Sequence, residues 1–250
     1  MRTQFCLNGE WNFMPLYEQG TGFGLPAELV YEEQKVQVPS SWRSSYERLP
    51  GKNFGIIPDY EYAPYDVFQY PKEWAQAEAG VLHRSFRVPP SMKEPGTRFF
   101  LRMDGIMQKA AVYLDHHLVA MWEDGYLPLL VEITELVRHD TEHELHVVCG
   151  SFDKVEIPSG QQKITGLAGS WFGSIARGIW QDVYLESQPE ISLADVTIRT
   201  SVRENRLEVD AAVIHPLASS LKTSHKAILH VRENGDSTSS PILQAEADVL

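Results

Sequence analysis

The feature that most constrains the fold is a succession of short segments in which hydrophobic and polar residues alternate and turn residues follow. The clearest strand candidates are 85–88, 97–103, 109–114, 118–122 and 144–149. Asp115-His116-His117 separates two of them, as a hairpin turn does. Helical signals are confined to the short runs 74–79 and 133–137, which need tertiary packing to form. This pattern predicts an all-β sandwich or jelly roll rather than an α/β fold.

The alternating pattern stops and restarts near Ser187-Gln188-Pro189, which predicts a boundary between a domain at 1–187 and a domain at 188–250. The second region contains four further strand candidates: 195–202, 207–213, 227–231 and 243–249. An immunoglobulin-like sandwich has about seven strands in ~100 residues. Four candidates in this shorter region therefore predict a partial immunoglobulin-like sandwich.

Composition excludes some partners. Of the 250 residues, 43% are hydrophobic and 22% are charged, which is typical of a soluble globular protein. The net charge of −12 repels phosphate backbones and anionic lipids, so we expect neither nucleic acid nor a membrane as a partner. Cys6 and Cys149 lie far apart in the sequence, and no basic-then-apolar leader precedes Leu7. Both observations predict reduced thiols in a cytoplasmic protein.

Residues 44–80 differ in character, because they are rich in Tyr and Pro and show little periodicity. We interpret them as a long loop over the sandwich, where binding residues often concentrate. An inert loop held in place by buried rings is the alternative.

Several blocks of sequence follow one another across residues 7–186. They are Leu7–Phe13, Val38–Trp42, His83–Pro89, Arg98–Ile106, Ala111–Asp115, Asp124–Leu129, Glu132–Thr134 and Gly178–Trp180. Together they resemble the N-terminal sugar-binding domain of glycoside hydrolase family 2, which contains β-galactosidases, β-glucuronidases and β-mannosidases. The resemblance implies a galactose-binding-like jelly roll at 1–187, and from 188 a weaker, fold-level similarity to the family's immunoglobulin-like domain. It also implies a parent enzyme that hydrolyses terminal β-glycosides with retention.

The chain departs from the family pattern at three positions. The family often carries an aspartate six residues before the glycine of Gly-Ile-Trp, whereas this chain has Phe172. The usual tyrosine before Arg84 is His83, and the usual hairpin glycine is His116. The contact that the family's aspartate makes with sugar is therefore not expected here.

A retaining glycosidase needs two carboxylates about 5 Å apart. The acidic pairs Glu32-Glu33 and Glu123-Asp124 consist of adjacent residues, which point to opposite faces when extended, so we interpret them as solvated. The resemblance places both catalytic glutamates in a C-terminal barrel, one of them after an asparagine, and this sequence contains no Asn-Glu dipeptide. We expect no catalytic residue in this chain, no activity of the chain alone, and the missing barrel as its partner.

Three histidines, His139, His143 and His146, have a spacing that superficially resembles a metal site. Residues 140–142 have the composition of a turn, His146 lies in a strand pattern, and no cysteine or further histidine completes a tetrahedral set. We therefore interpret these histidines as solvated and predict no metal site and no cofactor.

Sugar binding would depend on aromatic rings, which stack on pyranose faces, and on polar groups that fix the hydroxyls. Trp171-Phe172, between two glycines, is the best exposed candidate. The predicted carbohydrate-binding residues are Trp171, Phe172, Ser174, Trp42 and Arg43. Trp11 and Trp180 lie in strand patterns and are expected in the core.

The favoured hypothesis is the non-catalytic, carbohydrate-binding and scaffolding front part of a glycoside hydrolase family 2 enzyme. A stand-alone carbohydrate-binding module is one alternative. A structural or assembly domain without a ligand, which forms homo-oligomers through its aromatic loop, is the other.

Overall fold

The structure is a computed structural model of the 250-residue chain. It describes residues 2–17, 24–42, 68–77, 79–107, 109–150, 154–156, 162–164, 177–214, 226–232, 240–241 and 243–248. The chain divides into two compact units, 1–187 and 188–250. This division falls where the strand pattern restarts in the sequence; the assignment of the two units to named domain types stays a prediction.

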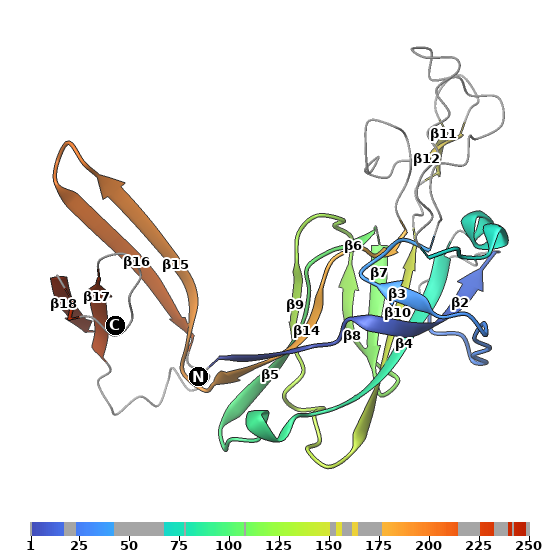
Figure 1. Cartoon of the computed structure of the whole chain (residues 1–250), viewed down its shortest axis with the longest axis horizontal. Helices are drawn as coiled ribbons and strands as arrows, with labels where there is room; N and C mark the ends of the chain where they lie inside the picture. The colour runs from blue at the N-terminus through green and yellow to red at the C-terminus, as the bar shows by residue number, and fades with distance from the viewer. Residues whose placement is uncertain are drawn as a thin grey trace. The chain divides into compact units, whose positions relative to one another are not determined.

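Strands make up most of the regular structure of the first unit (Figure 1). They are β1 (Thr3–Cys6), β2 (Gly9–Leu16), β3 (Val36–Val38), β4 (Ala79–Arg87), β5 (Thr97–Met103), β6 (Ile106–Met107), β7 (Lys109–Leu114), β8 (His117–Trp122), β9 (Leu129–Glu132), β10 (Glu142–Gly150), β11 (Lys154–Glu156), β12 (Gln162–Ile164), β13 (Gly178–Ile179) and β14 (Val183–Pro189). Two short 3-10 helices, η1 (Lys72–Gln76) and η2 (Pro90–Met92), flank β4.

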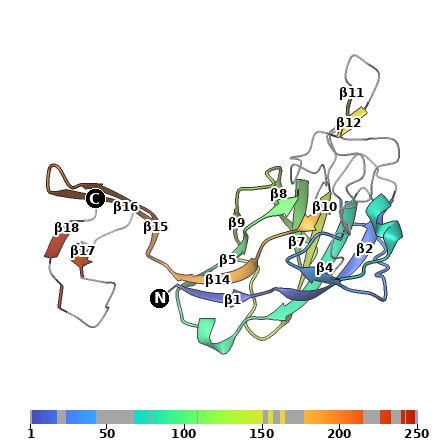
Figure 2. The ribbon, with the colours of Figure 1, turned by 45° about the horizontal axis from the view of Figure 1, so that its top comes forward.

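Two sheets enclose the core (Figures 1 and 2). One has the strand order β3-β2-β4-β10-β7-β8 and the other β1-β14-β5-β9. Alternate residues of β10, namely Leu145, Val147 and Cys149, lie in the core that the two sheets share, with Leu101 of β5 and Leu185 of β14. The prediction of an all-β sandwich is confirmed.

The other face of the six-stranded sheet has a smaller apolar cluster of its own. Val81 of β4, Ala111 of β7 and Val148 of β10 are buried there. Leu25 and Leu29, from the segment between β2 and β3, pack against them. This segment therefore covers part of the outer face, on which the alternation also places His83 and His146.

Several predicted strands agree with the structure. The bounds of β5 and β7 are those expected, and Asp115 and His116, with φ of 48° and 63°, form the turn between β7 and β8. The alternation of residues 179–185 after Gly178 predicts one continuous strand, and this prediction is wrong. The segment divides into β13 and β14 because the backbone N–H groups of Trp180 and Gln181 both donate to Gly105 O, at 3.1 and 3.4 Å, instead of continuing the ladder.

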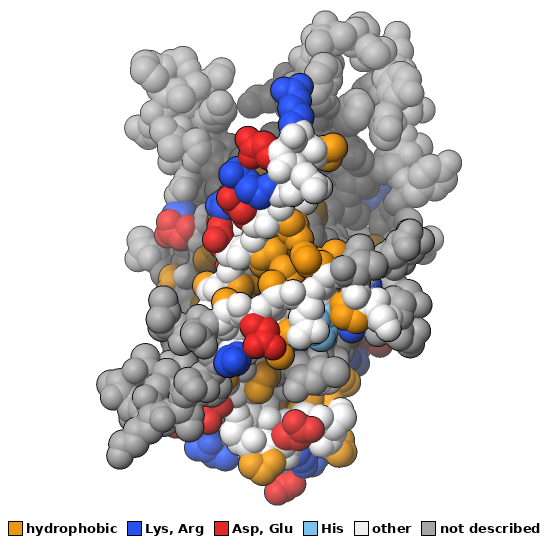
Figure 3. Space-filling model, turned by 90° about the vertical axis from the view of Figure 1, so that its left-hand side faces the viewer, with side chains coloured by type: hydrophobic (Ala, Val, Ile, Leu, Met, Phe, Trp, Pro, Cys, Tyr) orange, Lys and Arg blue, Asp and Glu red, His pale blue; other side chains and the backbone are white. Residues whose placement is uncertain are grey.

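The second unit contains the four predicted strands as two antiparallel hairpins, β15 (Ser192–Ser201) with β16 (Arg206–Ile214) and β17 (Lys226–Val231) with β18 (Leu243–Asp248). The hydrophobic side chains described in these strands are exposed or half-buried, for example Val196 and Ile198. Figure 3 shows hydrophobic side chains at the surface among charged and polar ones. The immunoglobulin-like assignment of this unit stays a prediction.

Both cysteines are free thiols, with Cys6 exposed on β1 and Cys149 buried in β10. Among the described residues, none of the helical segments has the length and hydropathy that crossing a membrane requires.

Candidate functional site

Four of the five predicted sugar-binding residues lie outside the described residues: Arg43, Trp171, Phe172 and Ser174. Their positions in the chain are nevertheless informative. Arg43 directly follows Trp42, and the stretch that contains Trp171 leads into Arg177. The anchoring of the described residues 40–42 and 177–179 therefore determines where both stretches are attached to the sandwich.

Three hydrogen bonds join these two anchoring segments. The Trp42 N–H donates to Arg177 O at 3.2 Å, and the Ser40 N–H donates to Ile179 O at 3.0 Å. The Arg177 N–H donates to Ser41 Oγ at 2.9 Å. Residues 40–42 and 177–179 thus form one junction, which Arg43 directly follows in the sequence and the stretch with Trp171 precedes.

Trp42 is a core residue at this junction. Its side chain is 0% exposed, and its ring lies 5.0 Å from that of Phe13. Gly178 has a φ of +110°, and a Cβ there would lie 2.9 Å from Trp42 Cε3, so only glycine permits this close contact. The Trp42 ring therefore presents no exposed face on which a sugar can stack, and this position does not favour the predicted role in binding.

Tyr126 is an exposed aromatic residue near the junction that the sequence interpretation missed. It is 46% exposed, and its ring lies 5.8 Å from Trp180, edge to face. Trp180 is half-buried and donates from Nε1 to Gly125 O at 2.9 Å, so it is only partly the core residue that was expected. Asp124 accepts the N–H groups of Tyr126 and Leu127, which lower the pKa of its carboxyl group. The sequence did not indicate that Tyr126 is exposed, because a loop has no hydrophobic periodicity that predicts which of its side chains face solvent.

The interpretation of three solvated histidines is wrong for two of them. His139 is exposed, but His143 and His146 are 1% and 3% exposed. Nδ1 of His143 lies 2.7 Å from Asp115 Oδ2, and its Nε2 lies about 3 Å from the Arg138 backbone. His143 thus ties the β7–β8 turn to the loop before β10.

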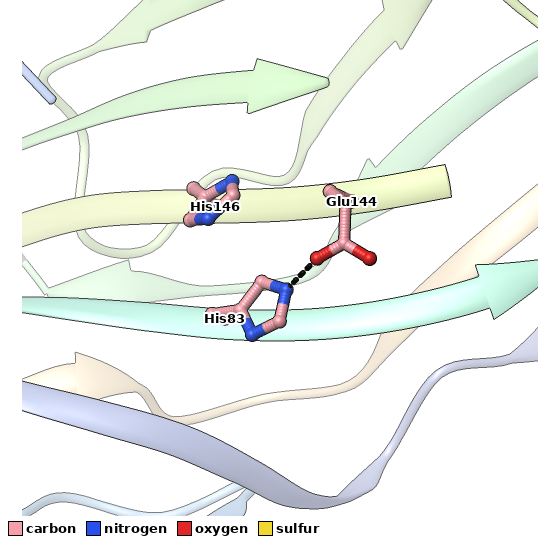
Figure 4. Close-up of side chains that lie close together, drawn as sticks. All are labelled: His83, Glu144 and His146. Atoms are coloured by element: carbon pink, nitrogen blue, oxygen red, sulfur yellow. Dashed lines mark hydrogen bonds and ion pairs between the residues drawn. The ribbon is translucent and has the colours of Figure 1, made fainter. Parts of the chain in front are cut away.

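His83, Glu144 and His146 form a group that is able to hold a metal ion (Figure 4). Each contributes one ligand atom, and these atoms all lie within 4.8 Å of one another. His83 and His146 are direct partners in the β4–β10 register, and Glu144 lies two residues before His146, on the same face. His83 Nε2 is bonded to a Glu144 carboxylate oxygen, and the two imidazole rings stack 4.6 Å apart. Sequence spacing missed the group because His83 lies on another strand.

The surroundings of this group leave some polar atoms unsatisfied. Nδ1 of His83 pairs with the Asn12 side-chain amide at 2.9 Å, and the Tyr31 ring stacks on His83 at 5.3 Å. Nδ1 of His146 and the hydroxyl group of Tyr31 are buried and have no hydrogen-bond partner. Burial lowers the pKa of His146 to about 4, and burial and Glu144 raise the pKa of Tyr31 to about 12.

The lowered pKa of His146 predicts a loss of stability in mild acid. Between pH 6.5 and about 4 the unfolded chain binds a proton at His146 that the folded chain does not, so stability decreases as the pH falls. With the metal chelator EDTA present, we expect His146 to contribute a loss of about 2 kcal/mol in the free energy of unfolding between pH 7 and pH 5. Urea unfolding measures this, and His146→Gln should have a correspondingly smaller pH dependence. The control His139→Gln, at an exposed histidine, should keep the wild-type slope; an unchanged slope in His146→Gln would contradict the prediction.

Comparison with known proteins agrees with this architecture. Residues 36–166 match the family model described as glycosyl hydrolase 2 galactose-binding domain-like. A β-glucuronidase of Bacteroides fragilis is 24% identical over 185 residues, which are 74% of this chain and 20% of that protein. A β-glucuronidase from an uncultured Clostridium species has a TM-score of 0.65 at 20% identity, over 99% of this chain and 39% of its own. The β-glucuronidase of Faecalibacterium prausnitzii also has a TM-score of 0.65, at 17% identity, over 99% of this chain and 40% of its own. The chain thus spans about a fifth of the sequence relative and two fifths of these structures.

Proposed function

The chain belongs to the glycosyl hydrolase 2 galactose-binding domain-like family, and from this we propose that it is the non-catalytic front part of a β-glucuronidase-type enzyme. The observation that carries the proposal is the match of 99% of this chain to 39% of a β-glucuronidase structure. The catalytic barrel then belongs to the remaining part of such an enzyme and is the main partner of this chain. The reaction of that enzyme is hydrolysis of a terminal β-glycoside with retention.

The proposed contribution of this chain to substrate binding is made at the junction of residues 40–42 and 177–179. The hydrogen bonds of this junction support the proposal, because Arg43 directly follows Trp42 in the sequence and the stretch with Trp171, Phe172 and Ser174 precedes Arg177. Aromatic rings in these stretches would stack on the sugar, and Ser174 would bond its hydroxyls. Arg43 is the proposed partner of a glucuronate carboxylate, since a guanidinium group binds carboxylates in a bidentate manner. Tyr126 is added to this set because its ring is exposed beside Trp180.

We place the enzyme in the cytoplasm, supported by the two free thiols. Homo-oligomers of the parent enzyme are also proposed, with the exposed hydrophobic residues of the second unit as the supporting observation.

The chain alone is expected not to hydrolyse a chromogenic β-glucuronide above the rate in buffer. The physical reason is that the proposed chain supplies loops to a pocket whose two carboxylates lie elsewhere. Calorimetry with glucuronate should show weak binding that Trp171→Ala and Arg43→Ala reduce, whereas the exposed control Tyr17→Ala leaves it unchanged. Measurable turnover by the purified chain would overturn the proposal. Tight, saturable binding would favour a stand-alone module, and no binding with concentration-dependent oligomers in light scattering would favour an assembly domain.

A further inference from the structure

We propose that His83, Glu144 and His146 form a site for one zinc ion on the outer face of the six-stranded sheet. This inference is separate from the proposed function, because it concerns the opposite face of this sheet from the shared core and a ligand other than a sugar. Three observations support it: the position of the ligands on paired strands, the buried nitrogen without a partner, and the orientation of His83 by Asn12.

The backbone register brings the three side chains together without any loop. His83 of β4 and His146 of β10 are directly opposite each other, and Glu144 is the next residue of β10 on that face. The ligand atoms lie within 4.8 Å of one another, whereas atoms around a tetrahedral zinc ion lie about 3.3 Å apart. Rotation of the side chains that moves each ligand atom by about an ångström therefore completes the tetrahedral geometry, and the backbone of the sheet does not have to move.

The buried nitrogen of His146 is the second observation. Nδ1 of His146 has no hydrogen-bond partner, although the side chain is only 3% exposed. A buried polar atom without a partner is unfavourable, and such atoms are rare in folded proteins. A metal ion bound to the ring of His146 would compensate for this missing contact inside the protein.

Asn12 supplies the outer contact that a metal-binding histidine needs. Its side-chain amide lies 2.9 Å from Nδ1 of His83, while Nε2 of His83 points to Glu144. In zinc sites the second ring nitrogen of a ligating histidine is usually fixed by such a contact. On zinc binding, the ring proton of His83 would move from Nε2 to Nδ1 by exchange with solvent, with no net release, and the Asn12 amide would turn over to accept the Nδ1–H through its oxygen.

The ion has a path from solvent and a candidate fourth ligand. The side chain of Glu144 is 40% exposed, so the group is open to water on one side. His116, in the exposed β7–β8 turn, has its ring 5.5 Å from that of His146. His83 and His116 are also two of the positions at which the sequence departs from the family pattern, and both lie at this group. We therefore assign the fourth position to His116.

The residue types select the metal. Three imidazoles and one carboxylate suit zinc and neighbouring transition metals, whereas magnesium and calcium prefer oxygen ligands. A zinc ion here would link β4 to β10 and, through His116, the β7–β8 turn.

The test is calorimetric titration of the full chain with Zn²⁺, together with the visible spectrum of bound Co²⁺. We expect one ion per chain, with a dissociation constant on the order of 10 µM or lower, and no binding of Mg²⁺ or Ca²⁺. Glu144→Gln and His146→Gln should each weaken binding by at least about 10–100-fold, since even outer-shell partners of a metal have effects of that size. Glu144 is partly exposed, so Glu144→Gln keeps the test valid if the buried variant does not fold.

The matched control is His139→Gln, an exposed histidine outside the group, which should bind zinc as the wild type does. Absence of saturable binding, or equal affinity in Glu144→Gln, His146→Gln and His139→Gln, would overturn the site. None of these measurements depends on sugar binding or hydrolysis, so the outcome is independent of the proposed function.

Discussion

Gly80→Ala is expected to lower the free energy of unfolding by about 3 kcal/mol or more. A Cβ atom at Gly80 would lie 2.3 Å from Cε2 and 2.9 Å from Cζ of Phe13, closer than atoms can approach. Phe13 is fully buried, with the rings of Trp42 and Trp74 at 5.0 and 4.7 Å, so it has no free space into which to move. The added methyl group therefore forces the backbone of β4 away from the sheet or displaces the aromatic core.

Urea unfolding followed by tryptophan fluorescence measures this effect, with Gly24→Ala as the matched control. A Cβ atom at Gly24 has nothing within 4 Å, so that variant should remain within about 0.5 kcal/mol of the wild type. The double variant Gly80→Ala with Phe13→Leu should be less destabilised than the sum of its single changes, because the smaller side chain removes the clash. Equal stabilities of Gly80→Ala and Gly24→Ala would show that the contact is not as described.

Glu186→Ala is the second change with a large expected effect, about 3 kcal/mol of destabilisation. The Glu186 carboxylate on β14 is fully buried and accepts hydrogen bonds from Arg2 Nε at 3.0 Å, Gln4 Nε2 at 2.7 Å and Arg102 Nη1 at 3.3 Å. Burial alone would raise the pKa of Glu186, but these partners outweigh it and lower the pKa below 4.5. Removing the carboxylate leaves the two arginines without their shared anion and removes the side-chain hydrogen bonds from Arg2 and Gln4 that reinforce the pairing of β1 with β14.

The same group predicts acid sensitivity. Because the folded-state pKa of Glu186 is lowered, its stabilisation is present above pH 4.5 and is lost as the pH falls through the folded value. Glu186→Gln should therefore lose less stability in acid than the wild type does. The control is Glu142→Ala, whose exposed carboxylate lies 3.8 Å from Arg87 and should contribute at most about 1 kcal/mol. A Glu186→Ala effect no larger than that of Glu142→Ala would refute the proposed role of this network.

The local sequence pattern was sufficient to predict individual strands, but it was insufficient to predict which distant segments each strand contacts. β5 and β7 were predicted with the observed bounds because each is a short alternating run that ends at a turn. The break between β13 and β14 depends on Gly105 O, about 75 residues earlier in the chain, and alternation within 178–186 contains no sign of it.

The same limit applies to the sites. His143 and His146 are predicted as solvated because residues 140–142 have the composition of a turn and no further ligand lies near in sequence, yet both are buried in β10 where it pairs with β4. Trp42 was a candidate for sugar stacking, but its contacts with Phe13 and Gly178 come from distant segments. The roles of Arg43, Trp171, Phe172 and Ser174 stay predictions, which depend on the family resemblance rather than on described contacts.

The environments of the two cysteines make the native sequence suitable for site-specific labelling. Cys149 is buried in β10, and burial raises the pKa of its thiol, so it is inert to maleimides while the chain is folded. Cys6 is exposed on β1. It lies opposite Tyr184 of β14, and Tyr184 comes a few residues before the boundary between the two units. A fluorophore coupled to the folded protein therefore attaches at Cys6, without mutagenesis, close to the point where the second unit begins.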